Sequence, residues 1–109
     1  MNDETIIGQF THEGTTYNVI KTHYDTQEGP VALIAQPLGS NDFADNTVLT
    51  VNLEGYGILP YPGYVNIDHK VAGTPLCHAF ADAFSDPEKP TYPVKYGFVE
   101  SYALPIKNL

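Results

Sequence analysis

Seven consecutive residues, Thr47-Val-Leu-Thr-Val-Asn-Leu53, carry the clearest strand pattern in the chain. Leu49, Val51 and Leu53 fall on one side of an extended backbone, and the two residues between them are polar. Alternation with period two, built from β-branched and apolar residues, is typical of a strand with one buried face. We therefore predict a strand here and expect the other strands to be arranged around it.

The same reasoning predicts further strands on both sides of this stretch. The first two flank a short polar turn and form a hairpin, whereas the third is apolar on both faces and is expected in the middle of a sheet. Loops rich in glycine, proline and polar residues separate these strands, and residues 86–93 are predicted to be an extended connection. The predicted additional strands cover residues 5–10, 15–24, 31–36, 64–68 and 96–104.

One helix is predicted, over residues 74–84. Thr74 is an N-cap residue and Pro75 occupies the first helical position, which is a common helix start. Apolar residues then recur with helical spacing and form one stripe. The stripe consists of Leu76, Ala79, Phe80, Ala83 and Phe84.

These elements predict an α+β fold in a single domain over residues 1–109. We expect an antiparallel sheet of five or six strands with one α-helix packed on one face, inserted before the last strand. The first and last strands are the expected edges of this sheet. An exposed edge allows pairing with a second copy, so a homodimer through an edge strand is a further expectation.

The charge balance restricts the partners that the chain can bind. Thirteen acidic residues face five basic ones, and the formal net charge is −8. All five basic residues are lysine, so the chain lacks the guanidinium fork that binds phosphate at two points. Direct binding of nucleic acid is therefore disfavoured, because that affinity comes largely from cations on phosphates. The acidity suits a partner with a basic surface, or it only maintains solubility.

Composition also bears on location and chemistry. Cys77 is the one cysteine, so an intrachain disulfide is impossible and a reducing compartment is favoured. The chain begins with acidic residues and contains no apolar run of about 20 residues, which favours a soluble cytoplasmic protein. The four histidines and Cys77 show no paired metal-ligand spacing, so we predict no metal and no cofactor.

Signals for catalysis are weak. No serine lies in a glycine-framed elbow, and Asp68 and His69 are adjacent on a predicted strand, where neighbours point to opposite faces. We therefore predict no catalytic residue. A cysteine-dependent enzyme that uses Cys77 with a nearby histidine remains the minor alternative.

The eight tyrosines are more informative, because tyrosine combines a large rigid contact area with a polar tip. One group, Tyr56, Tyr61 and Tyr64, lies in or beside the glycine- and proline-rich residues 54–63, and a second group precedes the predicted last strand. Tyr56 and Tyr61 fit either a protein-contact surface or an amphipathic core. A core position is favoured for Tyr96 and Tyr102.

Several local runs together resemble a family of small uncharacterised proteins carried by phages and mobile elements of bacteria. The resemblance extends from about Gly14 to Leu104 and implies a bacterial host cytoplasm, without an activity or catalytic residues to transfer. The runs are Gly14-Thr-Thr-Tyr17, Ala32-Leu-Ile34, Leu49-Thr-Val-Asn-Leu53, Tyr64-Val-Asn-Ile-Asp68, Gly97-Phe-Val99 and Tyr102-Ala-Leu-Pro105.

The leading hypothesis is a small acidic, non-enzymatic protein that binds a larger bacterial protein or ribonucleoprotein with a basic surface. We expect an inhibitor of a host nucleic-acid-handling defence complex, of the anti-CRISPR or anti-restriction type. The alternative is a structural or accessory protein of the mobile element. The predicted partner-binding residues are Tyr56, Tyr61, Asp42, Asp45, Glu54 and Glu88.

Overall fold

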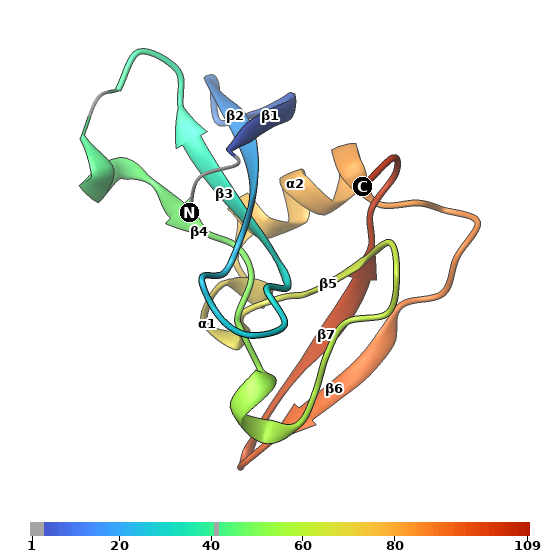
Figure 1. Cartoon of the computed structure of the whole chain (residues 1–109). Helices are drawn as coiled ribbons and strands as arrows, with labels where there is room; N and C mark the ends of the chain where they lie inside the picture. Colours follow the sequence, from blue (N-terminus) through green and yellow to red (C-terminus); the bar gives the residue numbers. More distant parts are fainter. Residues whose placement is uncertain (1–3, 41) are drawn as a thin grey trace.

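The computed structural model describes residues 4–40 and 42–109. It is built mainly of strands, with one helix of substantial length and one short helix (Figure 1). In chain order the elements are β1 (Thr5–His12), β2 (Thr15–His23), β3 (Val31–Pro37), η1 (a 3₁₀ turn, Phe43–Asp45), β4 (Thr47–Val48), η2 (a 3₁₀ turn, Glu54–Tyr56), β5 (Tyr64–Asn66), α1 (His69–Ala72), α2 (Pro75–Phe84), β6 (Tyr92–Tyr96) and β7 (Val99–Pro105).

The α+β class is confirmed, but the prediction of a single sheet of five or six strands is wrong. The described residues form a four-stranded sheet in the order β1-β2-β3-β4 and a three-stranded sheet in the order β5-β7-β6, both antiparallel. The prediction that the last strand is an edge is also wrong, because β7 lies between β5 and β6. β1 is an edge, as predicted.

Of the strand predicted over residues 47–53, only Thr47–Val48 is a strand, β4, and the rest is a segment that reaches the second sheet through an isolated bridge between Thr50 and Ile67. Strand β4 pairs with β3, and the Leu49 N–H still donates to the Leu33 carbonyl over 2.9 Å. Residues 49–53, here called the crossing segment, then turn to the second sheet. The Val51 N–H donates to the Asn66 carbonyl and the Asp68 N–H to the Leu49 carbonyl, each over 3.0 Å. One extended stretch thus joins two sheets.

Two tight hairpins form the ends of this arrangement. β1 and β2 turn at Glu13 and Gly14, which have φ of 51° and 79°, and β6 and β7 turn at Gly97, with φ of 58°, and Phe98. Positive φ at these positions matches the twist of antiparallel strands. The predicted extended connection 86–93 and single strand 96–104 are therefore corrected: β6 begins at Tyr92, and the chain reverses at Gly97. The helix consequently precedes the last two strands.

Helix α2 agrees closely with its predicted range. The Thr74 side chain accepts the Cys77 N–H over 3.2 Å, as expected for an N-cap. Its buried residues are Cys77, Phe80 and Phe84, whereas Ala83 of the predicted stripe is exposed. The buried face is thus rotated slightly from the predicted one.

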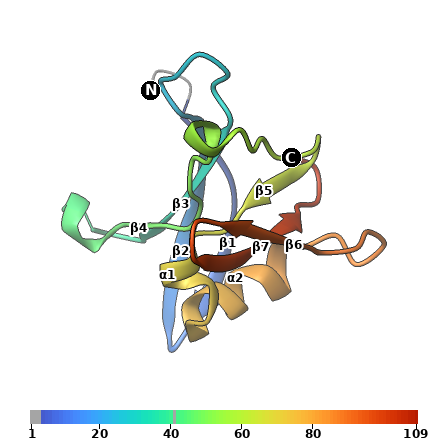
Figure 2. The same ribbon diagram turned by 90° about the horizontal axis from the view of Figure 1, so that it is seen from below.

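The core lies between helix α2 and the two sheets. Phe80, Leu33 and Leu49 are fully buried there, together with residues of β5 and β7. Helix α2 approaches β1 closely, since a Cβ at Gly8 would lie 2.9 Å from the Phe84 ring. Both helices lie on the same side of the molecule (Figure 2). Among the described residues, no helix is long and apolar enough to span a membrane.

Candidate functional site

The two tyrosine groups of the sequence meet on one face of β6. Tyr92 and Tyr96 are four residues apart on this strand and therefore point to the same face. The Tyr92 ring contacts the rings of Tyr61 and Tyr64, with centroid distances of 5.6 and 5.5 Å. The Tyr96 ring contacts the Tyr56 ring at 5.5 Å. Residues 54–64 thus cover β6 with aromatic contacts at both ends.

The Tyr96 end is tied to helix α1. The Tyr96 hydroxyl and the His69 Nδ1 are 3.1 Å apart, and Asp68 Oδ1 lies 3.5 Å from the same nitrogen. Tyr96 is buried, which agrees with its predicted core position, and Tyr102 is partly buried against the core. The Tyr56 ring lies outside Tyr96 and is 61 % exposed.

Between these two aromatic contacts lies a cleft of about 330 Å³, here called the tyrosine cleft. Residues 92–95 of β6 form one wall, and residues 58–61 form the other. Asn66 of β5 and Ala103 of β7 line the cleft between the walls. The rings of Tyr61 and Tyr92 border it from opposite walls, and Lys95 is the lysine that lines it.

Asn66 is the unusual residue of this cleft. Its exposure is 5 %, and its backbone carbonyl is used by the Val51 N–H. Within the part of the chain that the structure describes, the Asn66 side-chain amide has no protein hydrogen-bond partner, and its polar atoms are not fully enclosed, so they reach the cleft. Buried side-chain amides are normally satisfied, so an amide that only borders a cleft is a candidate contact for a ligand.

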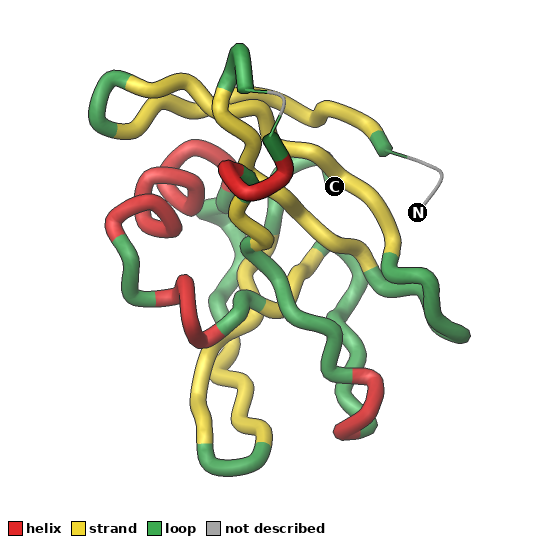
Figure 3. The backbone as a smooth tube through the Cα atoms, turned by 90° about the vertical axis from the view of Figure 1, so that its left-hand side faces the viewer, coloured by secondary structure: helices red, strands yellow, loops and turns green. Residues whose placement is uncertain are grey.

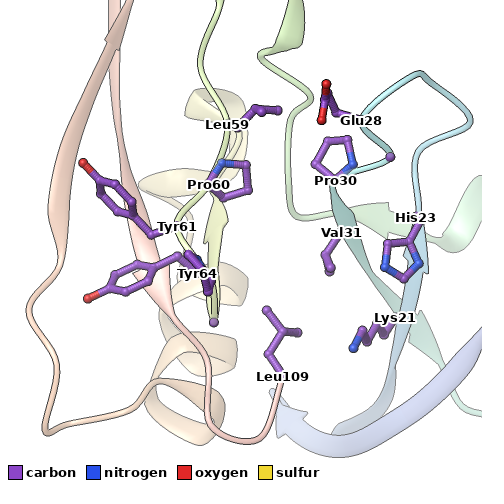
Figure 4. A pocket seen from close by; sticks show the side chains of 13 residues that line it. Lys21, His23, Glu28, Pro30, Val31, Leu59, Pro60, Tyr61, Tyr64 and Leu109 are labelled. Atoms are coloured by element: carbon purple, nitrogen blue, oxygen red, sulfur yellow. The ribbon is translucent and has the colours of Figure 1, made fainter.

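A second cleft, of about 290 Å³, lies on the other side of residues 59–64. Lys21, His23 and Val31 line its far side (Figure 4). The Tyr61 and Tyr64 rings are turned to the opposite side of the loop, toward β6 (Figure 4). Residues 59–64 therefore separate the two clefts, and the Tyr61 and Tyr64 rings lie on the side of the tyrosine cleft.

Of the predicted partner-binding residues, Tyr61 is 62 % exposed and Tyr56 and Glu54 lie together in η2. The Glu54 carboxylate accepts hydrogen bonds from the Thr26 hydroxyl and from the Glu28 N–H. It therefore connects η2 to the loop between β2 and β3.

The remaining predicted acids lie elsewhere. Asp42 accepts the Ala44 N–H over 2.9 Å, and Asp45 accepts the Ser40 hydroxyl over 2.6 Å, so both stabilise the loop around η1. Glu88 is exposed in the loop before β6. Figure 2 shows the η1 loop and the loop before β6 at opposite ends of the molecule. The structure therefore does not bring the four predicted acids to one surface.

Cys77, the candidate nucleophile of the alternative hypothesis, is fully buried in helix α2. Its Sγ lies 3.6 Å from the Tyr102 hydroxyl, and burial raises the pKa of the thiol. Reactive cysteines have the opposite features, namely exposure and a lowered pKa. Among the residues with described positions, no group of three histidine, cysteine or acidic side chains is placed to hold a metal ion.

Two features of the surface were missed by the sequence analysis. Asn66 was treated as an ordinary strand residue, and Phe98 was placed inside a strand. Phe98 instead lies fully exposed at the tip of the β6–β7 hairpin, which projects from the body (Figure 3). Gly97 was the available signal for this turn. No protein-family model, curated protein or solved structure matches the chain.

Proposed function

We propose that the protein is a non-catalytic binding protein that attaches to a larger bacterial protein. The observation that carries this proposal is an exposed aromatic and apolar surface over residues 56–61 and the β6–β7 hairpin, here called the aromatic face. Its members come from neighbouring segments, and the Tyr56 hydroxyl lies 4.0 Å from where a Cβ of Gly97 would stand. The aromatic face consists of Tyr56, Leu59, Tyr61, Tyr92 and Phe98.

Exposing such a surface to water is unfavourable in free energy unless a partner covers it when bound. A gathered set of large exposed apolar side chains commonly marks an interaction site. Tyrosine is also enriched among the residues that dominate binding energy. The positive φ of Gly97 fixes the turn that presents Phe98, so this ring can enter an apolar pocket of the partner.

The charge supports a basic partner. The net charge is −8, and Lys95–Glu100, at 4.0 Å, is an exposed ion pair that contributes little. Opposite charge on the partner accelerates encounter at low salt. Basic grooves are characteristic of enzymes that handle nucleic acid, so an inhibitor of a host defence nuclease of the CRISPR or restriction type is the specific function that we propose.

Two other functions are weighed against this one. An accessory protein of the mobile element would use the same aromatic face on a protein of that element. The buried thiol of Cys77 does not favour the cysteine-dependent enzyme. The identity of the bound protein separates the first two functions.

The test is binding of the purified protein to purified CRISPR and restriction complexes of its bacterial host, with nuclease activity measured in parallel. We expect binding that weakens with salt, inhibition of cleavage, and loss of both in the double variant Tyr56→Ala/Phe98→Ala. The matched control is Ile6→Ala/Leu38→Ala, which removes two exposed apolar side chains of the first sheet and its adjoining loop. Absence of binding to every such complex, or equal binding by both double variants, would refute the proposal.

The acidic contribution is tested by changing Asp42, Asp45 and Glu88 to lysine one at a time. Each exposed reversal changes the charge by two, so association slows and its salt dependence decreases if that acid faces the partner. Since η1 and the loop before β6 lie at opposite ends, we expect one end to respond more strongly. Equal association rates for all three variants and the parent protein would show that the acidity only maintains solubility.

A further inference from the structure

We propose that the tyrosine cleft is a binding site for an extended, proline-rich peptide segment, whose peptide group is held by the Asn66 side-chain amide. This inference rests on the proposed protein-binding function and specifies the chemistry that one part of the surface recognises. It is carried by the Asn66 amide and by the two tyrosine rings that border the cleft.

The Asn66 amide has the chemistry of a peptide-group receptor. Its two N–H groups can donate to main-chain carbonyl oxygens, which are the backbone groups that a proline-rich segment offers, because proline has no backbone N–H. The residue is 5 % exposed, lines the cleft, and has no side-chain partner among residues 4–40 and 42–109. A ligand that reaches into the cleft would supply hydrogen bonds to this amide in place of solvent.

The tyrosine rings on the two walls of the cleft favour proline side chains in the bound peptide. Tyr61 and Tyr92 meet edge to face, with an interplanar angle of 72°, so their faces are not stacked on each other. Both rings keep exposed surface beside the cleft. Grooves lined by aromatic rings are the usual receptors for polyproline II segments, which are already extended and lose little entropy on binding.

The charge of the cleft argues against nucleotides. Lys95 is the lysine that lines the cleft, and its Nζ lies 4.0 Å from Glu100. A phosphate in this position would meet one exposed lysine beside an acidic residue, within a chain of net charge −8. A neutral peptide avoids this repulsion.

The experiment is a titration of the full ¹⁵N-labelled chain with acetylated, amidated hexaproline, followed by two-dimensional amide spectra. We expect saturable shifts of the Asn66 side-chain amide and of backbone amides in residues 58–61 and 92–96, with a Kd of about 1 mM or tighter. The side-chain amide signal of Asn66 in the unmodified chain reports binding directly. The titration therefore remains informative even if a variant does not fold.

The matched pair of variants is Asn66→Ala and Asn18→Ala. Asn18 is an asparagine of the first sheet, away from the cleft, whose side chain accepts from Gln9. We expect about a tenfold weaker Kd for Asn66→Ala and an unchanged Kd for Asn18→Ala, because one hydrogen-bonding group is lost only at the cleft.

Three results would overturn the proposal: no saturable shift with hexaproline, shifts confined to residues outside the cleft, or equal weakening by both variants. Adenosine is added separately, and a shift of the Asn66 side chain by adenosine but not by hexaproline would assign the cleft to a base instead. A host complex that binds through Tyr56 and Phe98 while hexaproline does not bind would leave the proposed function intact and remove only the peptide site.

Discussion

Replacing Thr50 by valine removes one hydroxyl from the point where the two sheets meet. Thr50 is 2 % exposed, and its Oγ1 accepts the Leu33 N–H over 3.2 Å and lies 3.0 Å from the Tyr24 hydroxyl. Valine has nearly the same shape, so the change leaves packing almost intact. The Leu33 N–H would lose its acceptor in the interior, and the partly buried Tyr24 hydroxyl would lose its contact with Thr50.

The cost can be estimated from these two groups. An unsatisfied buried donor costs about 1–3 kcal/mol, and a partly exposed hydroxyl costs less, so we expect a loss of about 2 kcal/mol in the free energy of unfolding. For a domain of this size, that corresponds to a fall in Tm of about 10 °C. Urea denaturation monitored by circular dichroism gives the free energy, and the m-value is expected to stay constant.

Tyr24 supplies a second readout of the same change. Burial raises the pKa of its hydroxyl, and the hydrogen bond to Thr50 opposes that rise. In Thr50→Val the Tyr24 pKa should therefore move further upward, which near-ultraviolet absorbance can follow with Tyr24→Phe as the reference.

The control is Thr11→Val, since the Thr11 and Thr16 hydroxyls form an exposed contact at 3.2 Å. We expect a change within about 0.5 kcal/mol for this surface position. If Thr50→Val were as stable as the parent, or no less stable than Thr11→Val, the role assigned to the Thr50 hydroxyl would be refuted.

Three further predictions concern stability. Burial raises the pKa of Cys77 above its ordinary 9.0 and also raises the pKa of Tyr102, so the folded state keeps protons that the unfolded state releases. The contribution of these two groups to the free energy of unfolding should therefore be constant below about pH 8 and fall above about pH 9, with a smaller fall near pH 9–10 in Cys77→Ala, as denaturation across pH would show. Gly8→Ala should lower the free energy of unfolding by about 1–3 kcal/mol, because its Cβ would lie 2.9 Å from the Phe84 ring. In a double-mutant cycle, Phe84→Leu should reduce this loss. Simply additive effects of the two substitutions would contradict a contact between them. Asn66→Leu should raise stability by about 1 kcal/mol, because an amide without a protein partner is replaced by an apolar side chain of similar volume, and a loss of stability in denaturation would contradict this account of the residue.

Local signals made much of the fold predictable. The first hairpin, β3 and α2 follow from a turn at Glu13 and Gly14, an apolar run, and the Thr74-Pro75 helix start. The division into two sheets was not predictable, because alternation at residues 47–53 defines the buried face but does not specify the pairing partner. Within the stretch, pairing with β3 ends at Val48, and Thr50 then bridges to Ile67, the residue after β5.

The β6–β7 hairpin was missed for related reasons. Pro93 argued against a strand, yet β6 is an edge strand, where proline is tolerated. The prediction of a single strand over residues 96–104 places Gly97 inside a strand, whereas its positive φ starts a two-residue turn.

The candidate site was predictable in its residue types and not in its geometry. The sequence left Tyr56 and Tyr61 open between a contact surface and an amphipathic core, and the structure leaves both side chains exposed. It could not show that β6 brings Tyr92 to Tyr61, since that contact joins residues far apart in the chain. Asn66 gave no signal, because a polar residue in a strand usually faces solvent.

The crossing segment has a consequence for the order of folding. The β1–β2 and β6–β7 hairpins each close a two-residue turn, and such hairpins form in about 1–10 μs. We expect residues 49–53 to join the two sheets after the hairpins form, because Leu49 bonds to Leu33 in one sheet and to Asp68 beside the other. Substitutions at the hairpin turns should therefore slow folding, whereas substitutions in the crossing segment should mainly accelerate unfolding. The segment that holds the two sheets together would then set the lifetime of the folded molecule, while the two outer hairpins would set how fast it forms.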